Sequence, residues 1–407
     1  MSYLYDDQTK ESDTSKLNAQ AENVLLCLVL SSFLVNSIFL PKIAGYLLVA
    51  GVFGACLLWL VLTGEITFMI PKSIMLSYLS ILSLFIFGAG LNPSIRGVAR
   101  LGAFVSVTSV ILFLLILTVD FEIFWRLYGI VTAGIVVVGT PTLFVDQISL
   151  GSVVISSYTT TPTSPINIGI NTIQSIFINP NNLALVCGFA VVGLVTTQKW
   201  SKFIIIVVAI NAVGVFVSDG QAAQLATIAG IGIFSVGQFN RSLVPLVTTA
   251  ALTTIIGGML ILFKLLPGPE MISTISLSGR RHLWRASVHA LEMRPWVGYG
   301  PVNMGTVLEP YISDPRRLGA GPHNSYIRIA LTSGIFGLLS YLILHLYALF
   351  QSAKPSDCNT LASHAVLWSA IIFQLFNGKT IFGISPSSIL FAVALGWSLR
   401  ELSLTDI

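Results

Sequence analysis

The sequence has very few charged residues. Only 9% of its 407 residues are Asp, Glu, Lys or Arg, whereas a soluble globular chain carries roughly 25%. With 54% hydrophobic residues and a mean hydropathy of +0.86, the chain cannot cover its surface with hydrated side chains. These values exclude a soluble enzyme, a secreted scaffold and a nucleic-acid-binding protein, and they predict an integral membrane protein.

Cysteine is also scarce. The four cysteines, Cys27, Cys56, Cys187 and Cys358, lie far apart, and three of them fall within apolar runs. No C-x-x-C pair or group of histidines has the spacing of a zinc site, and the wide separation does not support a disulfide framework. We therefore expect buried thiols without a chemical role, and no metal site.

Long apolar runs make up most of the chain. About twelve of them approach the ~20 residues that a helix needs to cross a bilayer, and they are continuous rather than alternating, which excludes a transmembrane β-barrel. The sequence therefore predicts an all-α, polytopic bundle of transmembrane helices. The runs fall at residues 24–40, 43–62, 73–91, 98–119, 121–140, 182–198, 202–218, 221–238, 242–266, 326–350, 361–383 and 386–400.

These runs divide the chain into four regions. Residues 1–23 are polar and acidic, without the basic start of a signal peptide, and we expect a cytoplasmic tail. Residues 24–266 hold the first nine predicted spans, residues 267–325 form a large external loop, and residues 326–407 hold the last three spans. This organisation predicts a multi-pass protein of the inner (plasma) membrane.

The basic residues indicate how the chain is oriented. The connection between residues 141 and 181 contains no Lys or Arg, and loops of that kind are usually exported. With the N-terminus inside, both long loops are external. The residues that then fall inside, as the rule requires, are Lys199, Lys202, Arg241, Lys354 and Arg400. Lys42, Arg96 and Lys379 depart from the pattern because they fall outside.

The second long loop is rich in arginine. Seven of the twelve arginines lie between residues 280 and 328, no lysine accompanies them, and the few acidic residues leave an excess of positive charge. Arginine without lysine favours planar, bidentate recognition of carboxylate or phosphate. The alternative is a basic rim that rests on anionic lipid headgroups. The arginines are Arg280, Arg281, Arg285, Arg294, Arg316, Arg317 and Arg328.

This cluster begins in a short predicted helix. Ser278 is placed to cap it, and the first turn carries Arg280, where free amides and the helix dipole favour an anion. Arg280 and Trp284 share one face, whereas Arg281 lies on the next. The helix is therefore amphipathic and suited to the membrane surface, and we interpret Trp284 as an interface anchor rather than a platform for a sugar ring.

Four short motifs follow one another in this part of the chain. They are Gly279-Arg280 with Trp284, Gly298-Tyr299-Gly300, His323-Asn324 with Tyr326, and Gly334-Ile335-Phe336-Gly337-Leu338. In this order and spacing, the segments SGRRHLWRASVHALEMRPWVGYGPVNMG and GPHNSYIRIALTSGIFGLLSYL resemble the signature of the O-antigen ligase and O-antigen polymerase superfamily. Members of that superfamily are polytopic membrane glycosyltransferases.

The resemblance implies a specific reaction. A glycan would move from a polyprenyl-diphosphate carrier to a lipid or glycan acceptor, on the external face of the membrane and without metal or other cofactor. The family's catalytic histidine falls on His323 and its diphosphate-binding arginine on Arg280. Asn324, Tyr299 and Arg328 are further candidates for binding the diphosphate or the glycan.

One motif departs from the family pattern. A second arginine usually lies upstream in an S-R-G-A-like motif, but this chain reads SDGQAA from Ser218 and has no arginine there. Either Arg281, Arg285 or Arg328 supplies the charge, or the substrate binds differently. Asp219, within this segment, is a candidate for contacting an acceptor or a metal.

His323 suits the role of a general base. A neutral imidazole near pH 7 can accept the proton of an attacking sugar hydroxyl, and neighbouring arginines disfavour the imidazolium form. A single displacement of this kind inverts the anomeric centre. His323 could instead cap the tenth span, and Asn324 could orient His323, cap the helix or contact substrate. Tyr299 could stack on a sugar, whereas we expect His345 and His364 to be packed and hydrogen-bonded.

Three other functions remain open at this stage. A surface-polysaccharide polymerase of the same superfamily would share these motifs, and so would a ligase that modifies protein. A polytopic transporter would instead require paired ionisable residues in the middle of the membrane and symmetry between halves. The sequence favours the glycosyltransferase because its charged residues gather in an external loop.

Overall fold

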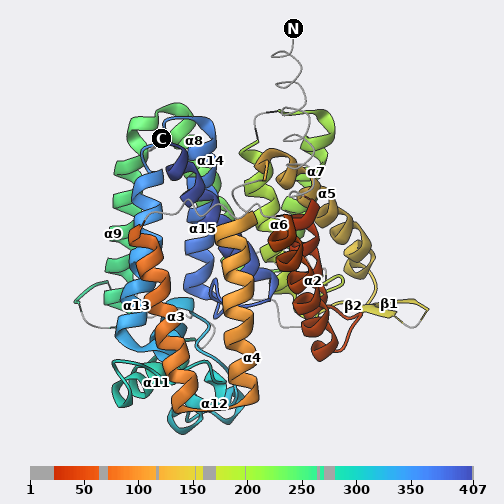
Figure 1. The fold of residues 1–407 in the computed structure, drawn as a ribbon. Helices are drawn as coiled ribbons and strands as arrows, with labels where there is room; N and C mark the ends of the chain where they lie inside the picture. Colours follow the sequence, from red (N-terminus) through yellow and green to blue (C-terminus); the bar gives the residue numbers. More distant parts are fainter. Residues whose placement is uncertain are drawn as a thin grey trace.

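The computed structural model of the chain is built almost entirely from helices (Figure 1). It describes residues 23–63, 72–115, 119–151, 153–158, 171–197, 199–263, 266–269 and 280–405. The predicted tail therefore lies outside the described residues, except for its last residue.

The elements follow in chain order. After a helix over residues 23–33 come η1 (Leu34–Asn36), α2 (Lys42–Thr63), α3 (Lys72–Leu91), α4 (Ile95–Ala103), η2 (Phe104–Thr108), η3 (Val110–Leu115), α5 (Phe121–Gly139), η4 (Thr140–Leu143), β1 (Gln147–Leu150) and β2 (Val153–Ser156). The second half contains α6 (Pro180–Val195), α7 (Lys202–Val217), α8 (Gln221–Phe239), η5 (Arg241–Leu243), α9 (Val244–Leu262), α11 (Arg280–Met293), α12 (Met304–Leu308), η6 (Glu309–Tyr311), η7 (Pro315–Arg317), α13 (Ser325–Ser352), α14 (Cys358–Phe376) and α15 (Pro386–Thr405).

Six helices in the described part of the chain are long and apolar enough to cross a membrane. They are Ile74–Leu91, Phe121–Leu143, Gln221–Phe239, Arg241–Leu262, Ser325–Ser352 and Cys358–Phe376. Shorter apolar helices, such as Pro180–Val195 and Lys202–Val217, accompany them. The predicted class of helical membrane protein is confirmed, whereas the figure of about twelve spans stays a prediction.

Polar side chains fix where several of these helices begin. Asn179 accepts a hydrogen bond from the Asn181 N–H at 2.8 Å, and Pro180 occupies the first turn, where its missing N–H costs nothing. Ser94, Asp120, Ser201, Asn324 and Asp357 cap other helices in the same way. These caps place the helix ends at the turns that separate the apolar runs.

Small residues bring α8 and α14 close together in the core. Ser369 donates a hydrogen bond to the Ala226 carbonyl at 2.8 Å. A Cβ at Gly230 would lie 2.2 Å from Ser369 Oγ, and one at Gly237 would lie 2.2 Å from Leu361 Cδ1. Close approach of backbones is the usual way in which helices associate in apolar surroundings.

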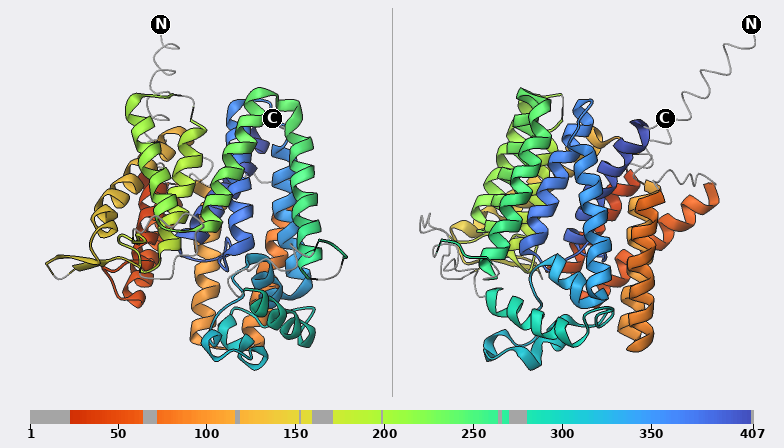
Figure 2. Two further views of the ribbon diagram at one scale, coloured as in Figure 1. Left: turned by 180° about the vertical axis from the view of Figure 1, so that it is seen from behind. Right: turned by 90° about the vertical axis from the view of Figure 1, so that its left-hand side faces the viewer.

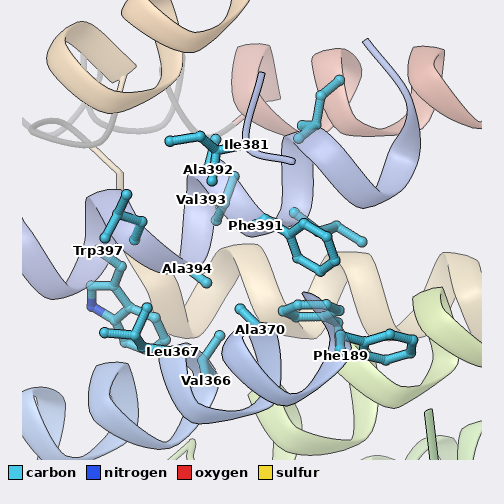
Figure 3. Packing of buried hydrophobic residues seen from close by; sticks show 14 of the residues in the cluster. Phe189, Val366, Leu367, Ala370, Ile381, Phe391, Ala392, Val393, Ala394 and Trp397 are labelled. Atoms are coloured by element: carbon cyan, nitrogen blue, oxygen red, sulfur yellow. The ribbon is translucent and has the colours of Figure 1, made fainter. Parts of the chain in front are cut away.

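Aromatic rings fill the neighbouring core between α6, α14 and α15 (Figure 3). The Phe189 ring lies 6.1 Å from that of Phe373 and 6.0 Å from that of Phe391. All three are buried. The three rings therefore pack α6, α14 and α15 against one another.

Both histidines of the core are buried and hydrogen-bonded, as predicted. His345 Nδ1 lies 2.9 Å from the Tyr341 carbonyl, and its Nε2 lies 3.3 Å from the amide nitrogen of Gln374. Because a carbonyl only accepts, Nδ1 donates and Nε2 accepts from the amide. His364 Nδ1 lies 2.8 Å from Ser352 Oγ. The two rings thus serve the packing of α13 and α14.

The four cysteines are free, but they are not all buried as predicted. Cys56 and Cys187 are buried, Cys358 is half-buried and Cys27 is exposed. Cys27 is exposed although it lies in an apolar run, so an apolar run did not guarantee burial inside the bundle.

α11 and α12 lie together at one end of the bundle, which we call the loop end (Figures 1 and 2). Two of the basic residues predicted to lie on the cytoplasmic side of the membrane donate hydrogen bonds to main-chain carbonyls at the opposite end of the bundle. Arg241 donates to Ser356 at 2.6 Å, and Arg400 donates to Val119. These two therefore lie at the end of the bundle far from the arginine-rich loop.

The long connection after α5 contains a β-hairpin that an all-α prediction did not include. β1 and β2 pair antiparallel, with Gln147 opposite Ser156. Gly151, at φ 62°, provides the left-handed backbone that a tight hairpin turn requires. The hairpin projects from the side of the bundle (Figure 1).

The apolar run at 361–383 is not one helix. α14 ends at Phe376, and residues 377–385 form a loop at the loop end. Asn377 is extended, at φ −124° and ψ 130°, and Gly378 follows it. An Asn-Gly pair favours a turn over a helix, which explains why α14 ends before the apolar run does.

α13 is broken near its start. Gly334 has φ 68° and ψ −168°, a conformation open to glycine but not to other residues. The break interrupts the regular pairing of backbone groups in the helix. Residues 294–301, which we call the strap, cross the break. The Ile335 N–H donates to the Pro295 carbonyl of the strap at 2.7 Å.

The strap also satisfies the carbonyl groups before the break. The Tyr299 N–H donates to the Leu331 carbonyl and the Gly300 N–H to the Thr332 carbonyl, each at 2.8 Å. Buried backbone groups must be paired, so the strap and the broken helix complete one another.

The crossing requires glycine because the backbones touch. A Cβ at Gly334 would lie 2.0 Å from the Trp296 carbonyl oxygen, and one at Gly300 would lie 2.5 Å from the Gly88 carbonyl oxygen of α3. Gly298 has φ 66°. The Gly298-Tyr299-Gly300 motif and Gly334 therefore belong to the same backbone crossing, which we call the joint.

Gly334→Ala should destabilise the protein strongly. The new Cβ would overlap the strap in a backbone conformation that alanine rarely adopts, so we expect a loss of about 2–5 kcal/mol of unfolding free energy. Thermal unfolding of the purified protein in detergent measures the effect. Gly257→Ala in α9 is the control, because a Cβ there meets nothing within 4 Å. Equal stability of the two variants would contradict the joint.

Candidate functional site

α11 has a buried face and an exposed face, as predicted. Its buried residues are Leu283, Trp284, Ala286, Ser287 and Ala290. Arg285 and His289 are exposed. The helix packs against the bundle through α12 and α13. Ser278, the predicted cap, lies outside the described residues.

Trp284 is not an interface anchor. Its side chain is 1% exposed, and its ring stacks on that of Phe263 at 5.8 Å. The indole Nε1–H donates to the Pro322 carbonyl at 2.7 Å. A buried indole needs such a partner, and here the partner is the residue before His323. Trp284 therefore ties α11 to the candidate catalytic residue.

His323 has an unusual backbone conformation. Its φ of 48° is uncommon for a residue with a side chain, and such conformations concentrate at functional sites. Pro322 on one side is held by Trp284. Asn324 on the other side accepts from the Ile327 N–H at 3.0 Å and donates to the Leu375 carbonyl at 2.9 Å. Asn324 therefore caps α13, while His323 stays exposed between two fixed neighbours.

The loop of residues 377–385 lies directly against His323. A Cβ added to Gly378 would lie 3.2 Å from the His323 nitrogen. Arg328 donates to the Gly378 carbonyl at 2.9 Å, and Ser325 donates to the Asn377 carbonyl at 2.7 Å. Three segments therefore meet at His323: α11 through Trp284, the start of α13, and this loop.

The surroundings of His323 favour its neutral form. His323 is exposed at the surface, but the protein around its imidazole excludes part of the water, and this desolvation lowers the pKa of His323 below its ordinary value. Positive charges lower this pKa further because they repel the imidazolium form. In order of effect they are Arg280, Lys379, Arg328 and Arg317.

Arg280 joins the site from the first turn of α11. Its guanidinium lies 5.9 Å from the centre of the Phe376 ring, at the end of α14. The group is half-buried, and burial lowers its pKa from the ordinary value. An arginine stays charged even so, because its pKa starts above 12. Arg280 thus brings a fixed positive charge close to His323.

Other predicted residues lie elsewhere at the loop end. Arg285 is exposed and Arg281 is half-buried, and neither is among the charges that act on His323. Tyr299 donates from its hydroxyl to the Ala290 carbonyl at 2.8 Å, and Arg294 covers its ring at 5.0 Å. The hydrogen bond to Ala290 attaches the strap to α11. Roles in substrate binding for Arg281, Arg285 and Tyr299 stay predictions.

Two cations beside His323 were not predicted as site residues. Arg317 lies in η7 and pairs with Asp314 at 3.4 Å. Lys379 follows Gly378 in the loop after α14. The sequence did single out Lys379, because its predicted position on the external side departs from the rule that positive charges gather on the cytoplasmic side. Which residues surround Lys379, however, depends on where α14 ends.

Asp219 occupies the segment in which the family usually has an arginine. It lies between α7 and α8, is half-buried, and has φ 51°. Its charge is not among those that act on His323. Cations from α11, η7, α13 and the loop after α14 surround His323 instead.

The described residues contain no group of three or more His, Cys, Asp or Glu placed to hold a metal ion.

The fold is that of a helical membrane protein, and a histidine lies among positively charged residues at one end of its bundle. Residues 204–342 match the family model described as O-Antigen ligase. The match runs from α7 into α13 and includes Arg280 and His323, and it confirms the resemblance to the O-antigen ligase and polymerase superfamily. It indicates a membrane enzyme of the ligase or polymerase type. No curated protein matches the chain.

Trp284→Phe should loosen the site. The change keeps the aromatic packing but leaves the Pro322 carbonyl without its donor, at a cost of about 1–3 kcal/mol in unfolding free energy. Thermal unfolding in detergent measures that cost. Trp296→Phe is the matched control because Trp296 is 61% exposed. If both variants unfold like the wild type, the hydrogen bond does not hold Pro322 in place.

Proposed function

We propose that the protein transfers a glycan from a polyprenyl-diphosphate carrier to a lipid or glycan acceptor, at the loop end of the bundle and on the external face of the inner membrane. One observation carries the proposal. His323 is held in a left-handed conformation among four cations that come from separate segments of the chain. A base beside a site for an anion is what this reaction needs.

His323 acts as the general base. The neutral imidazole accepts the proton of the acceptor hydroxyl while that oxygen attacks the anomeric carbon, a contribution of about 10²–10⁴ to the rate. The bond from the anomeric carbon to the diphosphate oxygen breaks in the same displacement, so the configuration inverts. The lowered pKa of His323 supports this role because it keeps the ring neutral near pH 7.

Arg280 binds the diphosphate. Its planar fork matches phosphate oxygens, and it stabilises the charge that develops on the leaving group. Charged hydrogen bonds contribute about 1.5–3 kcal/mol each, so two or three would give roughly millimolar to micromolar binding. The lipid tail adds affinity if it packs between apolar helices. No metal enters this reaction scheme.

The superfamily resemblance supports two further possibilities. A polysaccharide polymerase would use the same base and the same anion site but a growing glycan as acceptor, and a ligase of this type could also modify protein. A transporter receives less support, because the cations gather at the loop end around an accessible histidine.

His323→Ala should abolish transfer without preventing membrane insertion. The test is the profile of surface and lipid-linked glycans in a deletion strain that expresses either the wild type or the variant. The matched control is His289→Ala, since His289 is an exposed histidine of α11 whose partner is Glu292. We expect His289→Ala to restore the wild-type profile.

The profile also distinguishes the candidate functions. Long glycans left on the carrier indicate a ligase, and glycans that stop at one repeat indicate a polymerase. Full activity of His323→Ala would remove the base from the proposal, and an unchanged profile in the deletion strain would favour a transporter.

The value of kcat/KM for transfer should persist in mildly acidic solution. An unperturbed histidine has a pKa near 6.5, and a base works only when neutral. Because desolvation of the imidazole and the nearby charges lower the pKa of His323, the acid limb of kcat/KM should lie below pH 6.5. Initial rates with purified protein over a range of pH measure this limb, and size-exclusion profiles check that the protein stays intact. An acid limb above pH 6.5 would contradict the assignment.

A further inference from the structure

The loop of residues 377–385 is attached to the candidate site through its main chain. Besides the bonds from Ser325 and Arg328, the Ile381 carbonyl accepts from Thr108 Oγ1 at 3.1 Å. The Ile381 N–H donates to the Tyr341 hydroxyl at 3.4 Å. Ile381 is fully buried. The path of this loop therefore does not depend on the side chain of Lys379.

Lys379 lies on the part of this loop that contacts the histidine. Its carbonyl accepts from Ser325, two residues after His323, and its N–H donates to Asn377 Oδ1 at 3.0 Å. Gly378, the preceding residue, touches the His323 backbone. Its backbone is therefore fixed, while its side chain is exposed and its charge acts on His323.

We propose that Lys379 binds the diphosphate of the donor together with Arg280. This inference rests on the proposed function and adds a ligand-binding residue from the C-terminal part of the chain, outside the region that matches the family. The two cations come from α11 and from the loop after α14, two of the segments that meet at His323.

The chemistry of lysine suits this position. An ammonium is a compact charge on a flexible stem, and it binds phosphate as a point charge without the fixed fork of arginine. It can follow phosphate oxygens as the bond to the sugar breaks. Arg280 and Lys379 would then share the two phosphate groups.

The test measures binding of farnesyl diphosphate to the full-length protein in nanodiscs by calorimetry. Lys379→Gln should weaken binding about tenfold, the loss expected for one charged hydrogen bond. Lys379→Arg should bind within about threefold of the wild type because it keeps the charge. Lys354→Gln, an exposed lysine at the opposite end of the bundle, is the matched control and should bind normally. Arg280→Gln reports on the site as a whole.

Each result has one meaning. Weakened binding in Lys379→Gln with recovery in Lys379→Arg supports the inference. Normal binding in Lys379→Gln with weakened binding in Arg280→Gln overturns it and leaves the proposed function intact. Equal losses in Lys379→Gln and Lys379→Arg also overturn it, since position rather than charge would then matter. If the wild type does not bind the probe, or if neither Arg280→Gln nor Lys379→Gln changes binding, both the inference and the proposed diphosphate site fail.

Discussion

The break in α13 at Gly334 is the constraint on which the loop end depends. A helix among apolar neighbours must pair its own backbone groups, so an interruption persists only where other groups replace the lost partners. The strap of residues 294–301 replaces them, and the two backbones approach so closely that only glycine fits at the crossing. Because α11 leads into the strap and His323 leads into α13, this one joint fixes both segments that carry the candidate site.

The site is built outward from that joint by modest interactions. Each hydrogen bond contributes only about 0.5–1.5 kcal/mol net, yet a left-handed backbone at a residue such as His323 costs on the order of 1–3 kcal/mol. The conformation persists because Trp284 holds Pro322, Asn324 caps α13, and Gly378 lies against the backbone of His323 itself. Contacts from three separate segments therefore offset the free-energy cost of the left-handed backbone at His323. Removal of one contact should loosen the histidine before it unfolds the bundle.

The sequence predicted the parts of this arrangement that depend on local pattern. Apolar runs predicted the helices, the arginine-rich segment between residues 280 and 328 contains three of the four cations that act on His323, and the motif resemblance singled out Arg280 and His323. It failed where tertiary packing decides. Trp284 was predicted to lie at the membrane interface, but in the structure it is buried and its indole N–H donates to the Pro322 carbonyl. Lys379 lay within an apolar run, and only the early end of α14 at Phe376 brings it beside His323. Neither fact is visible in hydropathy or spacing.

The cations around His323 have two effects that belong together in the proposed reaction. In the empty site they oppose a proton on the imidazole, so the base stays neutral but is also weak. A bound diphosphate would offset these charges and favour the imidazolium form that the reaction produces. The imidazole would then become a stronger base when the donor is present, and the proton it accepts would lie close to the negative charge of the leaving group. Activation of the acceptor hydroxyl would thus depend on the donor through electrostatics alone, without any movement of the protein.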